Sequence, residues 1–172
     1  YPGFSASEIL FDSEGSGTGV ATNDMGISKD GTKGPNFEPG IELKAKQTIF
    51  SEGCRGHLGK IINKKFNLDK NSQPQTYAIG IKELWEVDKQ KHIPGTILHT
   101  TGWPLNKETY GGSFLYHFDK NLISIGFVIG LDYKNPYLSP YDEFQQFKHH
   151  PEIKKYLDGG RRIGYGARAL NE

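Results

Sequence analysis

Residues 113–131 read SFLYHF DKN LISIGFVIGL, and this stretch decides the fold. Two runs rich in aromatic and aliphatic residues, 113–118 and 122–131, flank the three-residue polar turn DKN. A turn this short can only join neighbouring strands that run in opposite directions. The stretch therefore predicts an antiparallel β-hairpin.

Further strand patterns lie on the N-terminal side of this hairpin. Alternating apolar residues predict strands at 76–87 and 96–103. Shorter patterns at 7–11 and 20–22 are separated by a turn rich in Gly and Ser, which predicts a second hairpin. The sheet is therefore expected to be built mainly from antiparallel neighbours.

The region between the second hairpin and the first helix has a mixed pattern. Residues 25–40 contain four Gly and two Pro, which favours an exposed loop over a packed element. Residues 42–50 begin with alternation and end in the apolar pair Ile49 and Phe50, so a strand with a buried end is expected there.

Three stretches have helical signals. Apolar residues recur at helical spacing over 57–66, and its other face is basic. Ser139 precedes Pro140, the order typical of a helix N-cap followed by proline at the first helical position. A further short helix is expected at 152–157. Together these elements predict an α+β fold, mainly an antiparallel sheet with helices on one face or end.

Composition excludes several classes of protein. The chain has 172 residues, enough for one sizeable core, and a net charge of +1, which provides no electrostatic footprint for nucleic acid. Its single cysteine, Cys54, excludes a disulfide framework and cannot alone supply a metal or iron–sulfur site built from several thiolates. The longest apolar run, 122–131, is about half of what a membrane-spanning helix needs.

Several short motifs do not support a function. Residues 164–169 match G-x-G-x-x-[GA] formally, but no strand–turn–helix pattern or following acidic residue accompanies them, so we interpret them as a close backbone passage. His149 and His150 are adjacent and would point about 100° apart on a helix. His99 and His117 lie on different expected strands and could meet on one face. No metal site and no catalytic side chain is predicted from these residues.

Two glycine-containing turns are more informative. After the expected strand, residues 51–56 read SEGCRG, where the backbone could approach a ligand or simply turn into the helix; the two interpretations weigh equally. Gly111 and Gly112 open the long hairpin, and their amide N–H groups could donate to a ligand carbonyl. The apolar, aromatic wall of such a pocket would come from Trp103, Pro104, Leu105, Tyr110, Phe114 and Tyr116. On this pattern alone, a bulge or turn is the stronger interpretation of the glycine pair.

Longer motifs resemble a known family, the electron-transfer flavoprotein:ubiquinone oxidoreductases. They cover essentially the whole chain in one order. In chain order they are IFSEGC at 49–54, QTYAIGIKELW at 75–85, TYGGSFLYH at 109–117, GFVIGLDY at 126–133, NPYLSP at 135–140, KHHP at 148–151 and GARALNE at 166–172.

The resemblance implies a membrane-associated (monotopic) flavoenzyme, an electron-transferring-flavoprotein dehydrogenase. Such an enzyme accepts electrons from electron-transfer flavoprotein and passes them through FAD and a [4Fe–4S] cluster to ubiquinone. It implies that Gly111 and Gly112 hold the quinone ring through backbone contacts. It also implies that Glu52 and Gly53 lie near the FAD of a glutathione-reductase-like flavoprotein fold. The implied location is the matrix side of the inner mitochondrial membrane, or a bacterial cytoplasmic membrane.

The chain departs from the family pattern at both ends. It lacks the strand, Gly-rich loop and helix that seat the FAD pyrophosphate, and the cysteine set for the cluster. We therefore expect an internal segment: residues 1–74 from the FAD-binding domain and 75–172 as the ubiquinone-binding domain. The isolated segment is expected to be inactive and to bind neither FAD nor a cluster stoichiometrically. Two alternatives stay open: a fragment of another FAD-dependent oxidoreductase or hydroxylase of this fold, and a non-enzymatic interaction domain.

Overall fold

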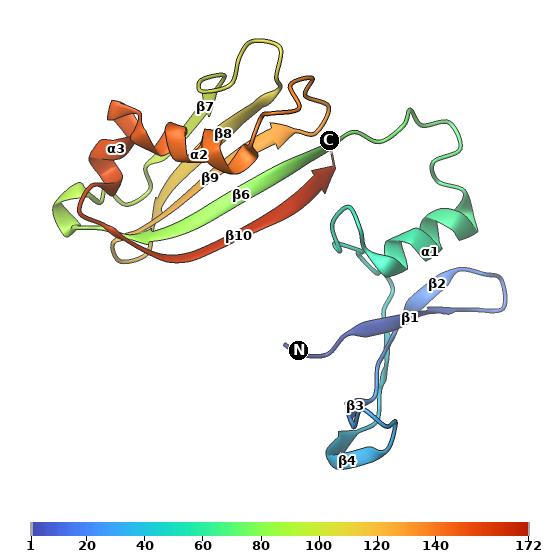
Figure 1. Cartoon of the computed structure of the whole chain (residues 1–172). Coiled ribbons are helices and arrows are strands. Elements are labelled where there is room, and N and C mark those ends of the chain that lie inside the picture. The colour runs from blue at the N-terminus through green and yellow to red at the C-terminus, as the bar shows by residue number, and fades with distance from the viewer. Residues whose placement is uncertain (1, 172) are drawn as a thin grey trace. The chain divides into compact units, whose positions relative to one another are not determined.

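The computed structural model describes residues 2–171, which divide into two compact units on either side of the Asn71–Ser72 bond. Unit 1 ends at Asn71 and unit 2 begins at Ser72. Figure 1 shows strands and one helix in unit 1, and a larger sheet with two α-helices in unit 2. Each unit is described by itself.

Unit 1 contains two small antiparallel sheets and one helix. Strands β1 (Ala6–Phe11), β2 (Gly17–Thr22) and β5 (Glu42–Lys44) form a three-stranded sheet in the order β1-β2-β5. Strands β3 (Met25–Ile27) and β4 (Lys33–Glu38) form a separate two-stranded sheet. The predicted hairpin over 7–22 is confirmed.

Two predictions in unit 1 were wrong. The stretch expected to be a loop contains the β3–β4 hairpin, closed by Asp30, whose carboxylate accepts hydrogen bonds from the backbone and hydroxyl of Thr32. Its residues are mostly exposed, as the glycine and proline content predicted. The same content gave no indication that the two strands pair. The strand expected to run to residue 50 ends at Lys44, and Ile49 is 87% exposed rather than buried.

Helix α1 (His57–Phe66) occupies the predicted residues. It buries Leu58, and its last turn carries Lys64 and Lys65. Basic residues at this end are favourable because the backbone carbonyls there bear partial negative charge. The helix ends at Asn67, which adopts the left-handed conformation that often terminates a helix.

Unit 2 is built on a five-stranded antiparallel sheet in the order β10-β6-β9-β8-β7. Its strands are β6 (Tyr77–Glu86), β7 (Ile97–Thr101), β8 (Gly111–Phe118), β9 (Leu122–Gly130) and β10 (Arg161–Asn171). A short 3-10 helix, η1 (Lys89–Lys91), follows β6. The β8–β9 hairpin, β6 and β7 confirm the strands expected from the sequence.

Two helices, α2 (Pro140–His149) and α3 (Pro151–Leu157), lie over one face of this sheet (Figure 1). The hydroxyl of Ser139 accepts a hydrogen bond from the Asp142 amide, which confirms the predicted N-cap. The predicted α+β class, with mostly antiparallel sheet and few helices, is confirmed.

The alternation along the strands gives the sheet two faces, which we call the helix face and the far face. Phe127 on β9 packs against Phe144 and Phe147 of α2, with ring centroids 6.2 and 5.3 Å away. Because cross-strand partners share a face, Leu115 lies on this helix face too, opposite Ile125. Further core residues of this face are Ile123, Ile129, Ile153 and Leu157. The odd-numbered residues of β8 and β9 therefore supply the core.

Strand β10 was not predicted. It pairs with β6 along its whole length, for example Ala169 opposite Ile79, with an irregularity between Arg162 and Gly164. The G-x-G-x-x-[GA] match lies inside this strand, so the sequence-based exclusion of a dinucleotide fingerprint is confirmed. The interpretation of it as a close backbone passage was wrong, because nothing lies within 4 Å of where a β-carbon on Gly166 would sit.

Candidate functional site

The glycine pair forms the first two residues of β8, near one end of the sheet. Gly111 pairs with Ile129 and Gly112 with Val128 on β9, while Gly112 also faces Thr101 on β7. The pair is therefore part of the sheet, not a free loop.

The two glycine amides have different surroundings. The amide of Gly130 donates to the Tyr110 carbonyl at 2.9 Å, and the amide of His117 donates to the Thr96 carbonyl at 2.9 Å. Backbone groups alternate in direction along a strand, so even-numbered residues of β8 face β9 and odd-numbered ones face β7. The Gly112 N–H thus points into the sheet. The Gly111 N–H points to the β7 side, where the pairing ends at Thr101.

A cavity of about 300 Å³ lies at this end of the sheet and is lined by both glycines. Its side chains come from the far face: His99 and Thr101 of β7, Tyr110, Phe114 and Val128. The volume is at the lower end of the range for small-molecule sites. The cavity combines an apolar wall with a few polar groups.

The expected aromatic wall is only partly present. Tyr110 and Phe114 line the cavity, and Tyr116 stacks on Phe114 at 4.8 Å. Leu105 is instead buried beneath Gly111, with its Cδ1 2.5 Å from the place of a β-carbon. Trp103 lines a different cavity.

The polar groups of the cavity offer donors for a ligand oxygen. Tyr116 Oη lies 3.4 Å from Nε2 of His99, and the His99 and Thr101 side chains are exposed. The Thr100 hydroxyl is less available to a ligand, because it is hydrogen-bonded to the Ser113 hydroxyl, with the two oxygens 2.5 Å apart. The Gly111 amide, Thr101 and His99 could therefore donate hydrogen bonds to a carbonyl-bearing molecule.

Glu52 and Gly53 lie in unit 1, immediately before α1. The Glu52 carboxylate accepts hydrogen bonds from the amides of Leu58 at 3.4 Å and Gly59 at 2.6 Å, and lies 3.4 Å from Nδ1 of His57. Gly53 has φ = 74°, which favours glycine. Within this chain, Glu52 therefore accepts hydrogen bonds from backbone amides in the first turn of α1, which have no partner inside the helix.

The histidines do not assemble a metal site. The sequence left open whether His99 and His117 meet on one face; they do not, because His99 is on the far face and His117 points into the core. His149 ends α2, whereas the neighbouring His150 caps α3. Within residues 2–171, no three His, Cys, Asp or Glu side chains are placed to hold a metal ion.

His117 is buried beside two other rings. Its Nδ1 accepts a hydrogen bond from the Ile93 amide at 3.1 Å, and its ring meets Tyr156 edge-on at 5.0 Å. Among the described residues its Nε2 has no hydrogen-bond partner. Burial lowers the pKa of His117, and the nearby His92 lowers it further. The ring is therefore kept neutral, with its hydrogen on Nε2.

Sequence reasoning missed a buried ionic cluster around Glu83 on β6. Its carboxylate accepts hydrogen bonds from Lys148 Nζ at 3.0 and 2.8 Å, Trp85 Nε1 at 2.8 Å and Arg162 at 3.0 Å. Burial raises the pKa of Glu83, but these three donors lower it more, so the net pKa lies below its usual value. The cluster joins α2, β6 and β10, which points to a structural role.

Most of unit 2 matches a known protein family. A family model described as "ETF-QO, ubiquinone-binding" matches residues 77–170, which lie within unit 2. The chain belongs to this family. ETF-QO abbreviates electron transfer flavoprotein-ubiquinone oxidoreductase, so the resemblance noted from the motifs is confirmed.

Relatives of this family match along the full chain. The chain is 62% identical to the mitochondrial electron transfer flavoprotein-ubiquinone oxidoreductase of Sus scrofa and 59% identical to that of Homo sapiens, covering 100% of this chain in both cases. The enzyme of the same name from Pseudomonas aeruginosa is 54% identical over 99% of the chain. The chain spans only 28% of the two mitochondrial relatives and 31% of the bacterial one.

Solved structures support the fold alone. The flavin-dependent brominase Bmp2 matches 98% of this chain and 38% of its own, with a TM-score of 0.53 and 14% identity. A triple mutant of that brominase gives a TM-score of 0.54. The arrangement is thus one that occurs in a flavin-dependent enzyme.

Two binding sites implied by the resemblance, the cluster site and the FAD pyrophosphate site, are not formed by the residues of this chain. A [4Fe–4S] cluster is held by four cysteine thiolates, and the sequence contains only Cys54. A FAD pyrophosphate site needs a glycine-rich turn between a strand and a helix, whereas the formal match lies within β10. No helix within residues 2–171 has the length and apolar character needed to cross a bilayer.

Proposed function

We propose that unit 2 forms the quinone site of a membrane-associated flavoenzyme that transfers electrons from electron-transfer flavoprotein to ubiquinone. The observation that carries the proposal is the cavity at Gly111 and Gly112, which lies inside the residues that match the ubiquinone-binding model. Unit 2 corresponds in this proposal to the ubiquinone-binding domain over 75–172. Residues 1–74 belong to a FAD-binding domain of glutathione-reductase-like fold.

The residues of the cavity supply binding and orientation. Gly111 donates its amide hydrogen to one quinone carbonyl, Thr101 offers a further donor at the same end, and His99 offers one beside Phe114. Donors held in place favour the reduced carrier, because reduction places negative charge on the carbonyl oxygens. Tyr110, Phe114 and Val128 cover the ring and exclude water. Electron transfer itself is chemistry that the cofactors supply when bound.

The remaining assignments follow from the relatives' names and the resemblance. Electrons reach the quinone through FAD and a [4Fe–4S] cluster held by other parts of the natural protein. Glu52 and Gly53 lie on the FAD side. The enzyme works at the matrix side of the inner mitochondrial membrane, or at the cytoplasmic membrane if the source is bacterial. The 54–62% identity along the chain favours this enzyme over the hydroxylase and interaction-domain alternatives.

The test uses the natural full-length protein that carries this chain and a soluble short-tail ubiquinone analogue. Val128→Trp fills the cavity from β9, and Tyr110→Ala removes an exposed wall. We expect each to raise the KM for the quinone at least tenfold, while reduction of the bound flavin by electron-transfer flavoprotein keeps its wild-type rate. Leu122→Trp is the matched control, because Leu122 lies on the same strand and face but outside the cavity lining.

Two results would refute the proposal. Unchanged quinone kinetics in Val128→Trp and Tyr110→Ala would show that the quinone binds elsewhere. An equal loss in Leu122→Trp would show that the variants act through the stability of the sheet.

A further inference from the structure

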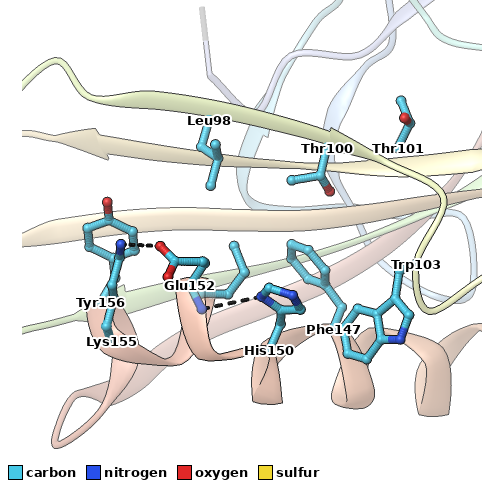
Figure 2. Close-up of a pocket in the computed structure, with 10 residues that line it drawn as sticks. Leu98, Thr100, Thr101, Trp103, Phe147, His150, Glu152, Lys155 and Tyr156 are labelled. Carbon is cyan, nitrogen blue, oxygen red and sulfur yellow. Dashed lines mark hydrogen bonds and ion pairs between the residues drawn. The ribbon is translucent and has the colours of Figure 1, made fainter.

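A second cavity lies on the opposite side of β7, between this edge strand and the helices. Its volume is about 350 Å³. Leu98 reaches it from β7, Phe147 from α2 and Ile153 from α3, so its floor is apolar (Figure 2). It shares only Thr100 and Thr101 with the cavity at the glycine pair. The two cavities are therefore separate spaces on either side of one strand.

Aromatic rings close this second cavity at both ends. Trp103 lies at one end and Tyr156 at the other, as Figure 2 shows. Trp103 is 52% exposed, so much of its indole has no contact within unit 2. A bound ring would bury that surface, and pairs of aromatic rings are favourable beyond the area they bury. The walls thus favour a flat aromatic ligand.

His150 is one of the polar residues that line this cavity, together with Thr100 and Thr101. Its Nδ1 accepts a hydrogen bond from the Glu152 amide at 3.3 Å, and its ring meets Trp103 edge-on at 5.1 Å. A neutral imidazole whose Nδ1 accepts must carry its hydrogen on Nε2. His150 therefore offers a donor, which selects a ligand with an acceptor oxygen.

The charges at the rim cancel. Glu152 and Lys155 both line the cavity and form an ion pair with each other (Figure 2). Because each is matched by the other, the rim attracts neither anions nor cations strongly. A neutral ligand is favoured.

We infer that this cavity is a second small-molecule site, which takes a neutral aromatic carbonyl compound of one or two rings. The rings lie between Trp103 and Tyr156, and the carbonyl oxygen accepts the hydrogen on Nε2 of His150. The volume falls within the range of small-molecule pockets. The site is independent of the proposed quinone site, because the side chains that select the ligand lie outside the glycine cavity.

The experiment uses the natural full-length protein and Prodan, a neutral naphthalene ketone whose emission shifts to the blue in an apolar pocket. We expect saturable binding with a blue shift, and a dissociation constant at least fivefold higher in Trp103→Ala. Trp103→Phe keeps an aromatic wall and should retain most of the affinity. Tyr110→Ala, in the glycine cavity, should leave the dissociation constant unchanged.

The role of His150 is tested with two competitors of matched size. 2-Acetylnaphthalene carries the acceptor oxygen and 2-ethylnaphthalene lacks it. We expect the wild-type protein to prefer the ketone at least fivefold and His150→Ala to lose this preference. The ratio of the two affinities is compared within one variant, so a general loss of stability does not change it.

Three outcomes would overturn the inference. Absence of saturable Prodan binding would show that the cavity is not a binding site for this class of ligand. A loss in Tyr110→Ala with none in Trp103→Ala would place the probe in the glycine cavity. Equal affinities of the wild-type protein for the two competitors would show that no hydrogen bond to the carbonyl oxygen contributes to binding. Because Val128→Trp tests quinone reduction separately, failure here leaves the proposed function standing.

Discussion

The carbonyl oxygen of Thr100 on β7 lies 2.4 Å from the position that a β-carbon on Gly112 would occupy. Real β-carbons essentially never approach a backbone oxygen this closely. Any other residue at this position must therefore push β7 away from β8. Gly112 is required by the close approach of two strands, whatever ligand the cavity holds.

We expect Gly112→Ala to lower the free energy of unfolding by about 1–3 kcal/mol, because the added methyl group forces a backbone shift. Urea denaturation followed by circular dichroism measures the change. Gly166→Ala is the matched control, since Gly166 lies in β10 with nothing within 4 Å of its added β-carbon. Equal effects at both positions would contradict the explanation. The result also means that Gly112 variants test folding and quinone binding together, whereas Tyr110 and Val128 variants separate them.

A second prediction concerns the Glu52 carboxylate at the start of α1. Glu52→Ala removes the acceptor for the amides of Leu58 and Gly59, and loss of such a cap costs about 1 kcal/mol. We expect faster hydrogen exchange at these two amides, measured by nuclear magnetic resonance. Glu14→Ala, in the exposed β1–β2 turn, should leave their exchange unchanged. Unaltered exchange in Glu52→Ala would rule out the capping role.

A third prediction concerns acid stability. The pKa of His117 is lowered from its ordinary value of 6.5 by burial and by His92. The unfolded chain therefore binds this proton more readily, so the free energy of unfolding falls as the pH drops below 6.5. His117 can change the free energy of unfolding by at most about 1.4 kcal/mol per pH unit, because it binds one proton.

Denaturation curves between pH 5 and pH 8 test this contribution. His117→Gln can still accept from the Ile93 amide but does not titrate, so its stability should depend less on pH. Identical pH profiles for the wild type and His117→Gln would contradict the assignment.

A fourth prediction concerns the Glu83 cluster. Lys148 is only 12% exposed, and removing it leaves a buried carboxylate short of its closest cation. We expect Lys148→Met to cost about 3 kcal/mol in thermal or urea unfolding. Arg162→Met should cost clearly less, because the Arg162 side chain is 41% exposed. The opposite order would show that the β10 contact, and not the α2 contact, stabilises Glu83.

The same cluster also depends on pH. The folded-state pKa of Glu83 lies below its ordinary value of 4.5, so its contribution is complete above pH 4.5 and is lost as the pH falls towards the folded-state pKa. The wild-type protein should therefore lose more stability than Glu83→Gln when the pH is lowered from 5 to 3.

Local patterns allowed the sequence to predict much of the fold. The helix over His57–Phe66 and the β8–β9 hairpin depend on spacing and turn residues within about ten positions, and both are present. Strand β10 was missed because most of its residues are exposed, so it has no apolar alternation. Its existence depends on pairing with β6, which lies about eighty residues earlier. Such a contact leaves no local signal.

The candidate sites show the same limit. Gly111 and Gly112 stand out in the sequence because paired glycines are unusual in a strand pattern. In contrast, Glu83 reads as an ordinary polar residue in an alternating strand, and its partner Lys148 follows 65 positions later. Trp103 follows β7 and His150 lies between α2 and α3, so these two rings likewise meet only in the tertiary structure. Side chains brought together by tertiary packing could not be predicted from spacing.

Strand β10 has a consequence for the behaviour of the segment in solution. It ends the five-stranded sheet and has a partner in that sheet on one side only. A long strand at the edge of a sheet can act as a template for aggregation through edge-to-edge pairing. Arg161, Arg162 and Arg168 lie along this strand and repel a second copy paired there, although Glu86 and Glu83 offset the charges of Arg161 and Arg162. Raising the salt concentration should weaken that repulsion and make the purified segment self-associate more readily.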